Sequence, residues 1–139
     1  MAALFGNLFA GSPPAGLGTI DGRLAACPAK PNCVSSQATD TDHLVAPLVF
    51  TGSARDAMAR LSRVVSVQPG ARVVEEREDY LRAAFQTPLM GFVDDVEFLL
   101  DSTRQVIDVR SASRLGHSDF GVNRKRVEAL RAAFAGGAA

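Results

Sequence analysis

Tyr80–Leu100 has the sequence YLRAAFQTPLMGFVDDVEFLL, in which two runs of alternating apolar and polar residues flank a proline-containing connection. A period of two is typical of a β-strand with one buried face, because successive side chains of an extended chain point to opposite sides. The first run predicts a strand over Tyr80–Gln86 and the second a strand over Phe92–Leu100. Residues 87–91 join them, so a β-hairpin stands at the centre of the predicted fold.

The alternation continues on both sides of this hairpin. Arg72–Arg77 precedes it and Gln105–Ser113 follows it, so four strands run one after another as an antiparallel meander. His43–Phe50 is apolar but contains Pro47. Proline is found at sheet edges rather than sheet centres, so this segment predicts an edge strand.

Two segments have helical periodicity instead. Ser53 is an N-cap candidate with Asp56 three residues on, and four apolar residues follow at helical spacing: Ala54, Met58, Leu61 and Val65. A closing helix is predicted after Ser118 or Asp119, and its inner stripe is Phe120, Val127, Leu130 and Phe134. The order β-α-β-β-β-β-α predicts a single α+β domain with both helices on one face of the antiparallel sheet.

The turn-forming residues are concentrated before this domain. Residues 1–42 are expected to form an irregular N-terminal arm, residues 43–135 the α+β domain and residues 136–139 a short tail. The chain shows no internal repeat.

The charge balance argues against nucleic acid as a partner. The 139 residues include 15 basic and 15 acidic ones, so the long-range field that nonspecific nucleic-acid binding needs is missing. No apolar stretch approaches the roughly 18 residues of a membrane-spanning helix, and Met1–Gly11 lacks the basic start of a secretory signal. A cytoplasmic protein is therefore expected. Leu4–Phe9 is apolar and forms either a peripheral membrane or partner contact or a frayed terminus.

Cys27 and Cys33 are six positions apart and flank Pro28 and Pro31. This spacing differs from that of a thioredoxin-type pair, and the prolines disfavour the helix start that such a pair uses. A disulfide is geometrically possible, but a cytosolic setting would keep the thiol pair reduced. A tight loop with partly buried thiols is favoured over a redox role. With two scattered His residues, no metal site and no cofactor is expected.

Two polar residues fall in phase with the predicted core. Asp94 alternates with the inward residues of its strand, whereas Asp95 and Glu97 point the other way. Asn123 lies in phase with the inner stripe of the closing helix. A carboxylate facing a core needs a hydrogen bond or a counter-charge. We therefore expect Asp94 to meet Asn123, with Arg124 or the first helical amides as further partners.

The opposite face of the sheet collects charges of both signs. The sequence places seven of them there: Glu75, Arg77, Asp95, Glu97, Asp108, Arg110 and Arg114. A solvated face with weak cross-strand ion pairs is the favoured interpretation. The alternative is that Arg110 and Arg114, with Ser111 and Ser113 nearby, bind an extended anion.

The chain resembles the DUF1499 family, whose name stands for a domain of unknown function. The resemblance runs from about residue 17 to residue 134, and its motifs are CPAKPNCVSSQ at 27–37, TPLMGFVDDVEF at 87–98, VRSASRLG at 109–116 and DFGVNR at 119–124. It implies membership and no particular activity. Bacterial members of the family can carry membrane anchors, and related domains occur in plastids.

Three functional classes remain open. The first is a noncatalytic module that binds a small hydrophobic or anionic molecule, with Asp94, Asn123 and Arg124 at its polar end. The second is an enzyme in which Asp94 is a buried acid or base assisted by Ser111, Ser113 or Arg114. The third is a protein-interaction domain that uses the arm and the charged sheet face. The binding module is the preferred hypothesis.

Overall fold

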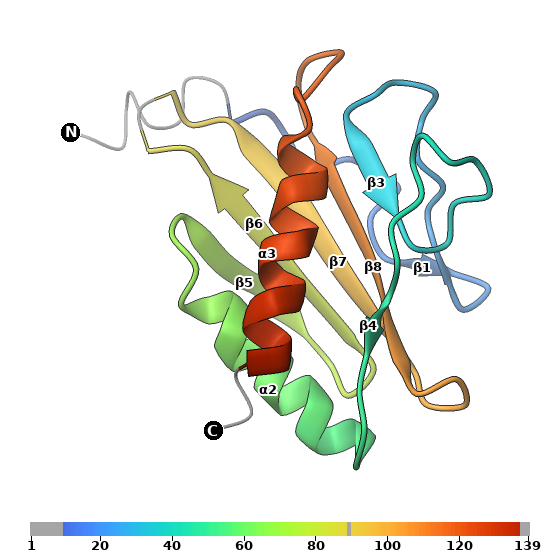
Figure 1. Cartoon of the computed structure of the whole chain (residues 1–139). Coiled ribbons are helices and arrows are strands. Elements are labelled where there is room, and N and C mark those ends of the chain that lie inside the picture. The colour runs from blue at the N-terminus through green and yellow to red at the C-terminus, as the bar shows by residue number, and fades with distance from the viewer. Residues whose placement is uncertain (1–9, 89, 137–139) are drawn as a thin grey trace.

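The computed structural model describes residues 10–88 and 90–136, which form one six-stranded sheet, a small hairpin and two helices (Figure 1). The central strands are β5 (Ala71–Glu76), β6 (Tyr80–Gln86), β7 (Val93–Asp101) and β8 (Val106–Ser113), each antiparallel to the next. This confirms the predicted meander. Two short strands, β3 (Cys33–Ser35) and β4 (Leu48–Val49), both pair with the free edge of β8.

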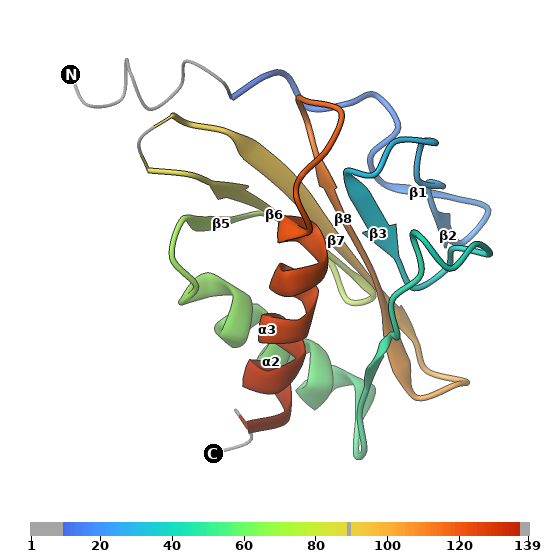
Figure 2. The same ribbon diagram turned by 45° about the horizontal axis from the view of Figure 1, so that its top comes forward.

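Both helices cover the same face of the sheet (Figures 1 and 2), so the predicted α+β class and element order are confirmed. Helix α2 (Ala54–Ser66) begins at Ser53, whose hydroxyl accepts the Asp56 N–H as an N-cap. Helix α3 (Val122–Gly136) buries Val127, Leu130 and Phe134 as predicted.

Phe120 is the exception to the predicted inner stripe of α3. It precedes the helix, has a left-handed backbone (φ 54°) and is 89% exposed, so its assignment to the core is wrong. The reason is the capping of α3. Asp119 accepts the N–H groups of Gly121 and Asn123, which starts the helix at Val122 and turns Phe120 outward.

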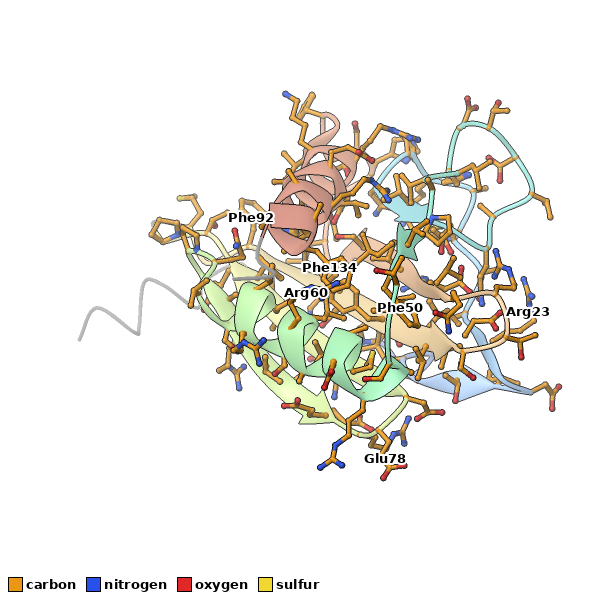
Figure 3. All side chains as sticks on the ribbon, turned by 60° about the horizontal axis from the view of Figure 1, so that its bottom comes forward. Arg23, Phe50, Arg60, Glu78, Phe92 and Phe134 are labelled. Carbon is orange, nitrogen blue, oxygen red and sulfur yellow. A yellow bond between two sulfur atoms is a disulfide. The ribbon has the colours of Figure 1, made fainter. Side chains whose placement is uncertain are left out.

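The main core lies between the sheet and the helices. Val96 and Phe98 of β7 contribute to it from the sheet, and Leu61 of α2 and Phe134 of α3 from the helices. The Arg60 guanidinium lies 4.2 Å from the centre of the Phe134 ring, and Figure 3 shows the two side chains together where α2 and α3 meet. Burial of this apolar face fixes the register of β7, which turns Asp94 toward the helices and Asp95 and Glu97 away from them.

The other face of the sheet carries the N-terminal arm. Within residues 1–42, expected to be irregular, the structure has β3 and a hairpin of β1 (Thr19–Ile20) and β2 (Arg23–Leu24). Leu24 packs on Tyr80 and Leu99 as a second small core.

The expectation of a solvated charged face is therefore wrong for the part under the arm. Four of the residues expected there are buried: Asp95, Glu97, Asp108 and Arg110. The sequence pattern gave their side of the sheet but not their burial, because nothing in the alternation of β7 and β8 tells whether another segment covers that side.

Candidate functional site

Asn123 is the centre of a polar network between α3 and the end of β8. Its side chain is 0% exposed. Asn123 Oδ1 accepts the Ser111 hydroxyl at 2.6 Å, and Nδ2 lies 3.0 Å from Ser113 Oγ and 3.2 Å from the carbonyl oxygen of Asn32. A buried amide with all these partners holds its neighbours in one arrangement. The predicted inward orientation of Asn123 agrees with this geometry.

Arg126 joins this network to Asp94. Arg126 Nη1 lies 2.7 Å from Asp94 Oδ2 and 2.9 Å from Asn123 Oδ1, and the guanidinium stacks over the Phe85 ring at 4.9 Å. The expected direct pairing of Asp94 with Asn123 is thus replaced by a bridge. Arg126 was missed at the sequence level, although its position three residues after Asn123 places both on one helix face.

Asp119 closes the network at the start of α3. Its carboxylate accepts Asn123 Nδ2 at 2.8 Å as well as the backbone N–H groups of Gly121 and Asn123. Burial alone would raise the pKa of Asp119. The hydrogen bonds outweigh that effect and place the pKa of this carboxyl below its ordinary value. Asp119 is therefore an anionic cap at the positive end of the helix dipole.

A groove of about 310 Å³ opens beside this network, between the β6–β7 connection and the β8–α3 loop. Its walls are largely apolar: Phe92, Val93, Leu115, Phe120 and Val122. Its polar lining includes Asp94, Ser113 and Asp119. Asp94 lines the groove while its Oδ2 holds Arg126.

The arginines expected at the site lie elsewhere. Arg110 and Arg114 are on the arm side of the sheet, where Arg110 Nη1 is 3.5 Å from Glu97 Oε1 and Arg114 makes two 2.8 Å hydrogen bonds to Asp95. Arg124 donates to the carbonyl oxygens of Leu44 and Asp42 and holds the 42–44 segment against α3. Ser111 and Ser113 are on the helix side, so the predicted set is divided between the two faces.

Cys27 and Cys33 form a disulfide with a Cα–Cα distance of 5.7 Å. The expectation that these thiols stay reduced is wrong for this structure. Cys33 belongs to β3 and Cys27 follows the β1–β2 hairpin, so the bond fastens the arm to the sheet edge. Spacing alone left this pairing open, since the closure depends on how the arm crosses the sheet.

The model of the family described as "Protein of unknown function (DUF1499)" matches residues 23–134. The chain belongs to the DUF1499 family. No curated protein and no solved structure matches it significantly. Within residues 10–88 and 90–136 of this DUF1499 domain, no helix is long and apolar enough to cross a membrane. The same residues contain no group of three or more His, Cys, Asp or Glu side chains placed to hold a metal ion.

The segments that carry the DUF1499 resemblance converge on the groove. Residues 87–98 supply one wall together with Asp94, residues 109–116 supply Ser113 and Leu115, and residues 119–124 supply Asp119 and Phe120. The first motif reaches the same place through Asn32, whose Nδ2 donates to the carbonyl oxygen of Gly116 at 2.8 Å. Periodicity could not reveal this convergence, because much of the groove is built from loops beside the ends of β7, β8 and α3.

Proposed function

We propose that this DUF1499 domain is a noncatalytic binding module whose groove takes one small amphipathic molecule. The observation that carries the proposal is the combination of apolar walls with a polar lining held by a buried network. A volume of about 310 Å³ lies at the lower end of small-molecule sites. It suits a small ligand or one end of a longer one.

The polarity of the lining narrows the ligand class. The charged groups at the groove are the carboxylates of Asp94 and Asp119. Arg110 and Arg114, which would have favoured an anion, are engaged by acids on the opposite face. A ligand with an apolar body and a hydrogen-bond-donating end, such as a hydroxyl or an ammonium group, fits this arrangement best.

The same geometry supports a binding module over the two alternatives. The enzyme hypothesis needed Asp94 isolated in an apolar setting, whereas Asp94 forms an ion pair with Arg126 at 2.7 Å. The interaction hypothesis needed a free charged sheet face, and the arm covers much of that face. Neither alternative gains support from a specific contact.

The disulfide also bears on the compartment. Structural disulfides persist in oxidising compartments and are rare in the cytosol. We therefore place the working compartment of the domain outside a reducing cytosol, in contrast to the cytoplasmic expectation. Protein isolated from its host in the presence of a thiol-blocking reagent checks this, since an intact mass without added blocking groups is expected. A fully blocked thiol pair would contradict it.

The binding proposal is tested with dodecylamine, dodecanol and dodecanoate as probes. We expect the amine or the alcohol to bind more tightly than the carboxylate. Val122→Trp fills the groove and should weaken probe binding by about tenfold or more. Val49→Trp is the matched control, because Val49 is also exposed but lies on β4, away from the groove. Equal binding by the two variants, or preference for the carboxylate, would overturn the proposal.

A further inference from the structure

Large apolar side chains gather around the mouth of the groove. Nine such side chains are exposed among the described residues. Five of them belong to the β6–β7 connection, the β8–α3 loop and the first residue of α3, and all but Met90 line the groove: Met90, Phe92, Leu115, Phe120 and Val122. We call these five the apolar rim. Single exposed apolar residues are normal on a protein surface, but a contiguous group at one end marks a site of contact.

Phe120 is held in position to project from this rim. Its left-handed backbone is unfavourable for a residue with a side chain, at a cost of order 1–3 kcal/mol. Two hydrogen bonds maintain it: Ser118 Oγ accepts the Phe120 N–H, and Asp119 accepts the Gly121 N–H. The loop thus holds an aromatic ring in solvent, although such rings are usually buried.

The rim contains few groups that resist transfer into an apolar phase. Residues 87–92 include no charged side chain, and Asp119 is the charged residue of segment 115–122. Its carboxylate already accepts backbone and amide N–H groups. Contact with lipid would therefore desolvate one carboxylate on these two loops, and its hydrogen bonds to backbone and amide N–H groups lower the cost of that desolvation.

The chain also enters the domain beside this rim. A Cβ added at Gly11 would lie 3.3 Å from the Leu115 side chain, so residue 11 passes directly over one rim residue. The nine residues at the N-terminal end of the sequence lie outside the described part, and five of them are large and apolar: Met1, Leu4, Phe5, Leu8 and Phe9. Two sources of apolar side chains therefore start from one end of the domain.

We propose that the apolar rim docks onto the surface of a phospholipid bilayer, with the mouth of the groove at the interface. The formal net charge of the chain is zero. The driving force is accordingly the insertion of apolar side chains rather than attraction to anionic headgroups. The docking does not require a ligand in the groove. A failed ligand-binding test would therefore leave the docking proposal intact, and a failed docking test would leave the binding proposal intact.

The test is flotation of the full chain with phosphatidylcholine vesicles. We expect the wild type to float and its partition to change little with salt, because no net charge is screened. Phe120→Ser should reduce the partition by about tenfold or more, in keeping with the transfer of one aromatic ring. Val49→Ser is the matched control and should float like the wild type, since Val49 is exposed at the opposite end of the sheet.

Several results would overturn the docking proposal. One is wild-type protein that stays with the soluble fraction, and another is Phe120→Ser protein that floats unchanged. Flotation with anionic vesicles only, abolished by salt, would show an electrostatic surface instead. A further variant carries Ser at residues 4, 5, 8 and 9. If this variant no longer floats while Phe120→Ser still does, the contact belongs to the N-terminal segment alone. Concentration-dependent dimers in sedimentation, lost in Phe120→Ser, without flotation would assign the rim to self-association.

Discussion

The Arg126 guanidinium lies 2.7 Å from the Asp94 carboxylate, so an ion pair on the helix side of the sheet ties α3 to β7. The side chains of Arg126 and Asp94 are 15% and 13% exposed. Removal of two charges from water is costly, and the attraction between them compensates only while both partners are present. This pair also fixes one wall of the groove relative to its polar lining.

Arg126→Met should lower the free energy of unfolding by about 2–4 kcal/mol, because it leaves Asp94 without its counter-charge. Urea denaturation measures the change. Lys125→Met is the control, since Lys125 is exposed on the same turn of α3, and it should change stability by less than about 0.5 kcal/mol. The double variant Asp94→Asn with Arg126→Met should be more stable than Arg126→Met alone. Equal effects of the Arg126 and Lys125 substitutions would contradict the role of the pair.

Tyr80 should stay protonated at alkaline pH until the protein unfolds. Burial, with a hydrogen bond of 2.6 Å to the Glu97 carboxylate and the charge of that carboxylate, raises the pKa of Tyr80 far above its ordinary value of 10.0. The folded form therefore holds its proton where the unfolded form loses it. Stability from this group is complete below pH 10 and falls as the pH rises beyond it.

This behaviour of Tyr80 is directly measurable, because the chain has one Tyr and no Trp. The ultraviolet tyrosinate band should appear together with the loss of the circular dichroism of the fold, not before it. Tyr80→Phe should lack this part of the alkaline pH dependence. A tyrosinate band that titrates near pH 10 in folded protein would show that the phenol is open to solvent.

Asp119 should contribute stability that depends on pH at the acidic end. Its pKa is lowered in the folded state, so the unfolded chain binds the proton more readily. The contribution is complete above the ordinary carboxyl value of 3.8 and is lost as the pH falls through the lower folded value. Asp119→Asn keeps a capping oxygen but removes the negative charge at the start of α3, and it should cost about 0.3–1 kcal/mol at pH 7.

Unfolding of the wild type and of Asp119→Asn, measured from pH 7 down to pH 2, checks this prediction. The two free energies should converge as the pH falls through the folded-state pKa of Asp119, which lies below 3.8, since the wild-type carboxyl is then protonated as well. A constant difference across the range would mean that the charge of Asp119 has no part in the effect.

The sequence predicted the architecture because the apolar residues of each element repeat at the period of that element. The alternation in Tyr80–Gln86 gave β6 with its observed bounds, and the same logic turned Asp94 toward the helices. Periodicity ends where regular structure ends. Phe120 looked like a helix residue by spacing, yet the Asp119 cap shifted the start of α3 beyond it.

The candidate site was predicted in part for the same reason. Asn123 and Asp94 were found because they are polar residues at positions where the apolar repeat places core residues. The residue that joins them, Arg126, has a long side chain, and periodicity does not predict what such a side chain reaches. The burial of Glu97 depended on the arm, and two of its partners lie 17 residues away at Tyr80 and 79 residues away at Gly18. Contacts at such separations are set by tertiary packing rather than by local pattern.

Removal of the disulfide should loosen the arm before it affects the meander. The Cys27–Cys33 bond closes a short loop, so its loss through Cys27→Ser with Cys33→Ser should cost about 2 kcal/mol. Before β3, the arm is also tied to the sheet by the bond from the Gly18 N–H to Glu97 Oε2, the bond from Arg110 to the Ala26 carbonyl oxygen and the burial of Leu24. Hydrogen exchange should therefore increase in residues 17–26, while the amides that pair β6 with β7 stay protected.

Reduction of the wild type with a dithiol is the matching experiment for this prediction. It should reproduce the exchange pattern of the double Ser variant, and the same reagent should leave that variant unchanged. A looser arm should also let water reach the Tyr80 phenol. Tyr80 should therefore ionise at lower pH in the double variant than in the wild type. Equal protection of residues 17–26 with and without the bond would show that packing alone holds the arm in place.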